Sequence, residues 1–224
     1  MACENTEIMT ILGPITADQL GPTYMHEHLI VDCSFSGNNP LKKVDDIEAL
    51  TWEMKDVLRA GGQTVVDCTC VGLAPQPTAL KKIAQETGIN IITSTGFYRK
   101  IVYPDYVSTL SAEQLAERLI KDCRDGFDDT DIRPGMLGEF ASHDDGPPDE
   151  NVEKVFRAAA LAHCATGLPI ATHCWVGVGS DWQIDILKRE GADLSKVIIG
   201  HAAASRPDIA ILRSILDCGA NIGV

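Results

Sequence analysis

Short apolar segments alternate with amphipathic helical segments along almost the whole chain. Six apolar segments lie at residues 24–33, 64–69, 89–94, 135–141, 168–174 and 196–201, and a seventh begins at residue 219. Segments with helical periodicity follow them at 44–60, 76–87, 111–125, 150–166, 182–190 and 207–218. Strands that alternate with helices through short turns pair in parallel, so the chain predicts an α/β fold. The apolar segments are nearly continuous, as expected for strands covered on both faces.

Two architectures fit this order: an open doubly wound sheet and a (β/α)8 TIM barrel. The nucleotide-binding form of the first carries a glycine-rich loop after its first strand, and no such loop follows residues 24–33. Polar residues close several of the predicted strands, which favours the barrel. We therefore predict a single TIM-barrel domain over residues 1–224.

The position of the last residue affects this prediction. Val224 lies inside the seventh predicted strand, whereas a TIM barrel usually has about 250 residues. We expect a barrel truncated within strand seven, which lacks the final strand and helices; a miscounted strand is the alternative. An unclosed barrel would expose a strand edge that favours association.

Composition restricts the class of protein. No apolar segment approaches the roughly 20 residues of a membrane span, and residues 1–5 lack the pattern of a signal peptide, so we expect a cytoplasmic protein. The net charge of −13 argues against nucleic acid and anionic membranes as partners, since both would repel the chain. The eight cysteines are scattered without a CxxC pair, which indicates reduced thiols that pack in the interior.

Four histidines and one glutamate stand near the ends of predicted strands. His26 and His28 are two residues apart in the first strand, so their side chains share one face. Glu139, His173 and His201 lie late in the fourth, fifth and sixth strands. Because functional groups of a TIM barrel gather at the carboxyl ends of its strands, we expect these five to converge.

Imidazoles and a carboxylate suit a divalent transition metal, and zinc is favoured over manganese, iron or cobalt. The set could hold two ions bridged by Glu139, with His26 and His28 on one ion and His173 and His201 on the other. A bound ion lowers the pKa of water to about 7, and a second ion polarises the oxygen of a substrate. The sequence therefore predicts a metallohydrolase with a small-molecule substrate. For each histidine singly, a structural hydrogen-bonding role is the alternative.

Other candidate ligands are weaker. His143 lies in a polar loop and is expected to be solvated, although it follows Glu139 closely enough to line the barrel mouth. His163 lies within a predicted helix, where we expect a structural role. Cys68 and Cys70 share one face of a strand, and we expect them to pack rather than to bind a metal.

These residues together resemble the phosphotriesterase family of the amidohydrolase superfamily. The resemblance covers residues 11–224 and rests on segments 12–15, 20–21, 25–29, 95–98, 103–104, 138–139, 172–173 and 199–201. It implies a (β/α)8 barrel with a binuclear centre, usually zinc, that hydrolyses phosphotriesters, lactones or amides. It is also compatible with a homodimer. The substrate stays open, because specificity would come largely from loops after strands seven and eight.

The resemblance also assigns individual residues. Four histidines match the metal ligands of the family: His26, His28, His173 and His201. Gly138 occupies a position that is often a carboxylated lysine, and Glu139 resembles the bridging glutamate of the homology-protein branch. Tyr98 matches a tyrosine that lines the substrate pocket in some members, although it could simply pack beneath the barrel rim.

Two features depart from the family pattern. The remaining metal ligand and proton-handling aspartate belongs to the eighth strand, beyond Val224, so we assign no catalytic residue. Ala202, Ala203 and Ala204 follow His201 at positions that are often acidic. A catalytically impaired metal-binding relative is therefore the alternative to an active hydrolase. An unrelated α/β enzyme with structural histidines is a third interpretation.

Overall fold

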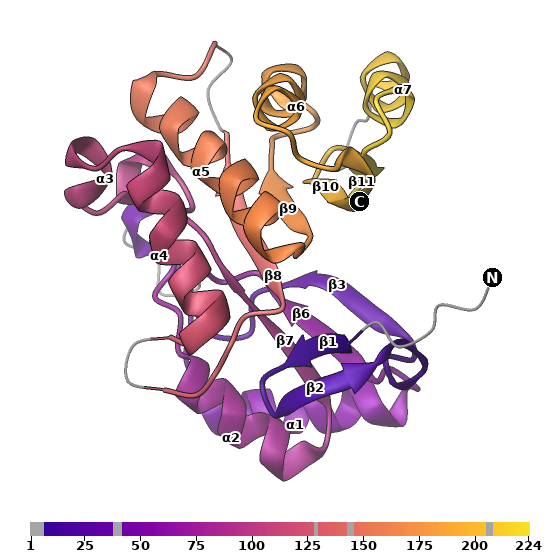
Figure 1. The fold of residues 1–224 in the computed structure, drawn as a ribbon. Coiled ribbons are helices and arrows are strands. Elements are labelled where there is room, and N and C mark those ends of the chain that lie inside the picture. The colour runs from indigo at the N-terminus through magenta and orange to yellow at the C-terminus, as the bar shows by residue number, and fades with distance from the viewer. Residues whose placement is uncertain (1–6, 38–41, 128–129, 143–145, 205–207) are drawn as a thin grey trace.

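A curled parallel sheet covered by helices forms the centre of the computed structural model, which describes residues 7–37, 42–127, 130–142, 146–204 and 208–224 (Figure 1). Its strands are β3 (Thr23–Glu27), β6 (Thr64–Asp67), β7 (Asn90–Thr95), β8 (Met136–Ala141), β9 (Ile170–His173), β10 (Val197–Gly200) and β11 (Asn221–Ile222). They pair in the order β11-β10-β9-β8-β7-β6-β3, and every pairing is parallel. The sheet is a half-barrel, which confirms the predicted α/β class.

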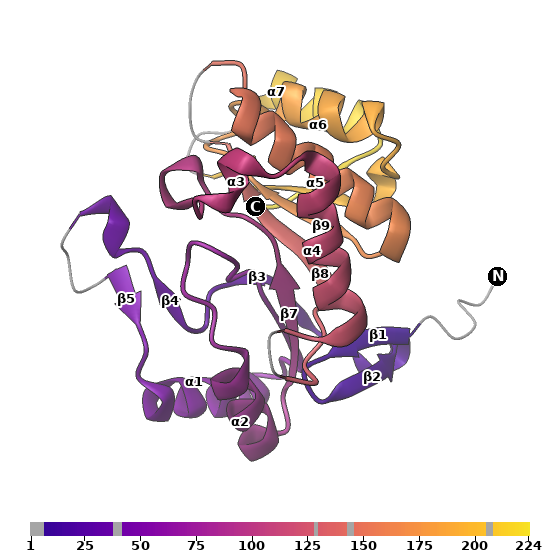
Figure 2. The same cartoon turned by 60° about the vertical axis from the view of Figure 1, so that its left-hand side comes forward.

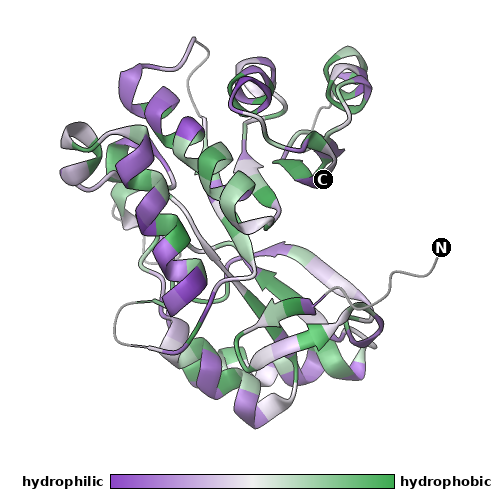
Figure 3. Ribbon diagram, in the orientation of Figure 1, coloured by the Kyte–Doolittle hydropathy of each residue, from purple (hydrophilic) through white to green (hydrophobic). Residues whose placement is uncertain are grey.

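Helices cover the outer face of this sheet. They are α1 (Ile47–Arg59), α2 (Pro77–Thr87), α3 (Tyr106–Thr109), α4 (Ala112–Asp125), α5 (Glu150–Thr166), α6 (Ser180–Arg189) and α7 (Ile209–Asp217). Helix α1 packs against α2, α4 against α5, α5 against α6, and α6 against α7. Figure 3 shows hydrophilic and hydrophobic residues interleaved along these helices, as expected for helices with one buried face. No helix of the described residues is long and apolar enough to cross a membrane.

Side chains that alternate in direction along the strands divide the apolar residues between two layers. Ile91 of β7 packs outward with Leu80 of α2, whereas the next residue, Ile92, packs inside the curl with Val66 and Met136. Successive residues of a strand face opposite sides of the sheet, so one strand contributes to both layers. This explains why the strands read as continuous apolar segments in the sequence.

Local signals at the helix ends agree with the sequence. A capping box begins helix α4, whose helical segment is predicted from residue 111: the Gln114 amide donates to Ser111 Oγ at 3.3 Å, and the Ser111 amide donates to Gln114 Oε1 at 2.9 Å. Helix α5 begins after the N-cap Asp149 and ends at Gly167, whose φ of 72° is left-handed. Glycine tolerates this conformation without a steric cost, so it ends the helix.

Two predicted boundaries are wrong by three residues or more. The first strand ends at Glu27 rather than at residue 33, because the Leu29 amide leaves the sheet and donates to Asp67 Oδ1 at 2.8 Å. Helix α1 begins at Ile47 rather than at residue 44, since the Asp46 side chain caps it by accepting from the Ala49 amide at 3.0 Å. In both places a side-chain carboxylate, not hydrophobic periodicity, decides where the element changes.

Several small elements are absent from the prediction. Strands β1 (Glu7–Thr10) and β2 (Gly13–Thr16) form an antiparallel hairpin, and β4 (Val31–Asp32) pairs with β5 (Lys43–Val44). Figure 2 shows the β4–β5 ribbon standing away from the sheet. Short 3-10 helices lie at Ala17–Gln19, Ser34–Ser36, Lys100–Val102 and Leu194–Lys196. The hairpin lies at the amino end of β7, where the Ile11 amide donates to the Ile91 carbonyl at 2.7 Å.

Candidate metal centre

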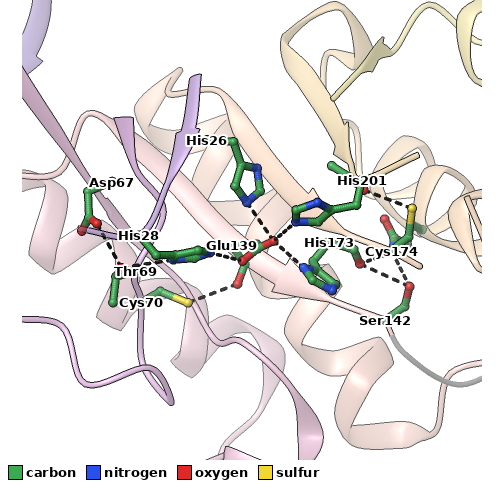
Figure 4. Close-up of polar contacts among 12 residues, drawn as sticks. His26, His28, Asp67, Thr69, Cys70, Glu139, Ser142, His173, Cys174 and His201 are labelled. Carbon is green, nitrogen blue, oxygen red and sulfur yellow. Dashed lines mark hydrogen bonds and ion pairs between the residues drawn. The ribbon is translucent and has the colours of Figure 1, made fainter. Parts of the chain in front are cut away.

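All five residues singled out in the sequence meet at the carboxyl ends of the parallel strands (Figure 4). His26 belongs to β3, and His28 lies one residue past its end. Glu139 belongs to β8, His173 is the last residue of β9, and His201 directly follows β10. Residues far apart in sequence thus come together because neighbouring parallel strands end at the same edge.

Glu139 lies at the middle of this group and is fully buried. Its Oε1 lies 3.1 Å from His26 Nε2, 2.7 Å from His173 Nδ1 and 3.5 Å from His201 Nε2. Its Oε2 lies 3.3 Å from His28 Nε2. Burial alone would raise the pKa of Glu139, but the close contacts with the four imidazoles outweigh it and hold that pKa well below its usual range. The carboxylate is therefore charged at neutral pH.

The contacts of Glu139 fit a bound cation better than hydrogen bonding alone. Three ring nitrogens approach Oε1, whereas a carboxylate oxygen has two lone pairs. Within the described residues, neither the buried His26 Nε2 nor Glu139 Oε2 forms a hydrogen bond of regular geometry. All ion pairs of Glu139 there are with histidines, so no lysine or arginine neutralises it. A buried carboxylate needs such a charge.

The donor atoms form two groups that share the carboxylate. One group is His26, His28 and Glu139, and the other is Glu139, His173 and His201; the ligand atoms of each lie within 4.8 Å of one another. Imidazole nitrogen and carboxylate oxygen are the donors that zinc and related divalent ions accept. The grouping is the same as the one that the sequence suggested.

Close backbone packing places Glu139 at the centre. Gly138 has a φ of 128°, and a Cβ atom added there would lie 2.3 Å from the Ala171 carbonyl oxygen of β9. A Cβ atom at Gly96 would lie 2.8 Å from the backbone of Gly138. No side chain fits at residue 138 without a shift of the backbone. The next residue, Glu139, takes the central place.

His201 also has an unusual backbone conformation. Its φ of 55° lies in the left-handed region, which costs a residue other than glycine about 1–3 kcal/mol. The chain turns sharply after β10 at this residue, and the ring lies 4.7 Å from the His26 ring and 4.5 Å from the His173 ring, measured between centroids. Strain of this kind is typical of functional sites.

Comparison with known proteins identifies the family of this chain. The sequence pattern of the phosphotriesterase family matches residues 6–224. The chain belongs to the phosphotriesterase family. The phosphotriesterase homology protein of Escherichia coli is 32% identical, over 92% of this chain and 70% of that protein. An N-acetyltaurine hydrolase of Xenopus tropicalis is 32% identical, over 90% of this chain and 66% of the length of that hydrolase.

Solved structures of this family share the fold. The E. coli phosphotriesterase homology protein, solved with phosphate in its active site, has a TM-score of 0.86 at 32% identity, over 92% of this chain and 70% of that one. A lactonase of Listeria monocytogenes has a TM-score of 0.89 at 26% identity, over 97% of this chain and 71% of that one. The half-barrel therefore corresponds to part of a phosphotriesterase-family TIM barrel, and family members are binuclear metal hydrolases.

Tyr98 lies directly beside the centre, as its match to a family pocket residue suggests. Its ring meets the His173 ring edge-on, with centroids 5.4 Å apart and planes at 83°. The Phe35 ring also contacts the Tyr98 ring, at 6.1 Å between centroids. Burial, with the charge of Glu139 nearby, raises the pKa of the Tyr98 phenol, which therefore stays protonated. Contact between Tyr98 and a substrate stays a prediction.

The remaining candidates that the structure describes lie outside both ligand groups. His163 is a buried structural residue: its Nδ1 donates to the Leu168 carbonyl at 2.7 Å, and its Nε2 accepts from the Asp193 amide at 3.1 Å. Cys70 lies close to the centre but donates its thiol proton to the Glu139 carbonyl at 3.2 Å. Cys68 packs in the apolar interior of the curl. His143 lies outside the described residues.

Sequence reasoning missed the residues that hold the histidines in place. Gln183 of α6 is fully buried and donates to the His173 carbonyl at 3.1 Å. Thr69 and Asp67 lie behind His28 and are also buried. The available signal was a pair of polar residues, two apart, at the end of the apolar segment 64–69.

Proposed function

We propose that this chain carries the metal centre of a hydrolase that binds two divalent ions, zinc by preference. The observation that supports it most strongly is the convergence of four imidazoles on one buried carboxylate, Glu139. Membership of the phosphotriesterase family supports the reaction class. The bond attacked would be an ester, lactone, phosphotriester or amide bond of a small molecule.

The two ligand groups would each hold one ion. His26 and His28 would bind the first, His173 and His201 the second, and Glu139 would bridge them. Bound there, the ions would make a water molecule nucleophilic at neutral pH and polarise the oxygen of the substrate. The neutral imidazoles would leave the charge of the ions intact, while Glu139 offsets part of it.

The exposure of the ligands indicates how reactants approach. The Glu139 side chain is 0% exposed, whereas the His201 side chain is 35% exposed. The carboxylate thus closes the bottom of the site and the imidazoles line its open side, where water and substrate would enter. Tyr98, edge-on to His173, would pack against the substrate.

Metal binding without turnover is the second candidate function. It is favoured by Ala202–Ala204, since the residues directly after His201 carry no group that could accept a proton. Ala202 is buried, and its amide donates to the Gly223 carbonyl at 3.1 Å. A cytoplasmic location, a homodimer and the single domain stay predictions of the sequence.

Metal stoichiometry tests the proposal. We expect about two ions per chain by plasma mass spectrometry, at most one in His26→Ala, and two in His163→Gln, which alters a histidine outside the centre. A folded wild-type protein without metal would contradict the proposal. Metal-dependent hydrolysis in a panel of esters, lactones, phosphotriesters and amides would then separate an active hydrolase from a protein that only binds metal.

A further inference from the structure

A chain of hydrogen bonds runs from His28 back to strand β6, on the side of the ring away from Glu139 (Figure 4). His28 Nε2 faces Glu139 Oε2 at 3.3 Å, while His28 Nδ1 lies 3.1 Å from Thr69 Oγ1. Thr69 Oγ1 in turn lies 3.0 Å from Asp67 Oδ1. The ring therefore has one nitrogen toward the centre and the other toward a buried hydroxyl.

The protons of this chain can be assigned from the number of donors. Asp67 Oδ1 accepts from the Leu29 amide at 2.8 Å. The Thr69 hydroxyl has a single proton and donates it to the same oxygen at 3.0 Å. Thr69 can then only accept from His28. His28 Nδ1 therefore carries the ring proton, and Nε2 presents its lone pair to the centre.

We propose that Thr69 and Asp67 are positioning residues, which hold His28 in the orientation and tautomer that a metal ion requires. This inference rests on the proposed metal centre. A metal-binding histidine commonly donates its other ring N–H to a carboxylate or carbonyl, and loss of that acceptor weakens metal binding about 10- to 100-fold. Here the Thr69 hydroxyl is the acceptor, and it donates in turn to the Asp67 carboxylate.

Burial explains why both residues are needed. Asp67 is 2% exposed and Thr69 is 1% exposed, so water cannot replace either hydrogen bond. Their spacing of two places both side chains on the same side of the chain, opposite Cys68, which packs inside the curl. The Leu29 amide, in the residue after His28, donates to the same carboxylate. Asp67 therefore positions both the His28 ring, through Thr69, and the backbone next to His28.

The test compares two substitutions of Thr69 that differ in whether the buried hydroxyl is kept. Thr69→Val removes the hydroxyl and keeps the shape, and Thr69→Ser keeps the hydroxyl. Thr51→Val is the matched control, because Thr51 is also buried and its hydroxyl donates to the Ile47 carbonyl within α1, at 2.7 Å, away from the centre. Zinc affinity is measured in competition with a chromogenic chelator. Long-range ¹⁵N–¹H NMR of histidine-labelled protein reports the tautomer, with His28→Gln to assign the signals.

We expect Thr69→Val to weaken zinc binding by about 10- to 100-fold, and Thr69→Ser and Thr51→Val to stay within about threefold of wild type. The His28 signals should show Nδ1–H in wild type and lose that preference in Thr69→Val. If valine prevents folding, Thr69→Ala removes the same hydroxyl. Asp67→Asn keeps an acceptor for Thr69, so it should preserve the tautomer.

Two results would overturn the inference: wild-type zinc affinity and tautomer in Thr69→Val, or Nε2–H at His28 in the wild type. If the wild type binds no zinc, the proposed function fails by itself. The NMR measurement on the zinc-free protein then still decides whether Thr69 sets the His28 tautomer.

Discussion

At the scale of single residues, glycines decide which side chain occupies the centre. Gly138 permits β8 and β9 to approach so closely that its missing side chain would meet the Ala171 carbonyl at 2.3 Å. Glu139 can lie at the middle of four imidazoles only because its neighbour has no side chain. The sequence predicts Glu139 through its place late in a strand, but the requirement for glycine at residue 138 depends on a contact between two strands and has no local signal.

Gly138→Ala should therefore remove both metal and stability. We expect a loss of about 3 kcal/mol or more in the free energy of unfolding, because the clash adds to the cost of a positive φ. Gly13→Ala is the matched control: Gly13 has a φ of 121° but nothing within 4 Å of an added Cβ, so it should lose about 1 kcal/mol. Urea denaturation and metal analysis measure both effects. Equal losses in the two variants would mean that the contact with Ala171 is unimportant.

At the scale of elements, local signals predict the helices and the strands of the parallel sheet well, and the antiparallel pairs outside that sheet poorly. Helix α5 has its predicted bounds because Asp149 caps it and Gly167 ends it. The β1–β2 hairpin escapes prediction because it is held by a carbonyl of β7 that is distant in the sequence. Contacts between segments distant in sequence also explain which parts of the site could be predicted. Its ligands follow apolar strands, which a pattern reveals, whereas the Thr69 hydrogen bond joins two separate segments.

His163 provides a prediction at the junction of α5, β9 and the segment after α6. Its two ring nitrogens satisfy the Leu168 carbonyl and the Asp193 amide, and the side chain is buried. His163→Leu fills a similar volume but leaves both backbone groups without partners, so we expect a loss of about 2 kcal/mol in unfolding free energy. Metal content should stay at the wild-type value. A lower metal content in the folded variant would contradict the structural role assigned to His163.

At the scale of the whole molecule, the candidate ligands connect the two ends of the sheet. His26 and His28 come from the segment around β3, at one edge, whereas His201 follows β10, next to the other edge strand β11. Within the described residues, β3 and β11 do not pair with each other. Ions held by both groups would therefore tie together parts of the sheet that the backbone hydrogen bonds do not join directly.

Zinc should consequently stabilise the whole fold. A ligand that binds only the folded state stabilises it by about 2.7 kcal/mol at a free concentration of 100 times its Kd, so the Tm should rise on addition of zinc and fall after chelation. Calcium should have little effect, because it prefers a shell of oxygen ligands. His26→Ala should lose most of the zinc-dependent shift, since it removes a ligand from the β3 side. A Tm that is the same with zinc and with chelator would show that the histidines do not link the two edges through a metal.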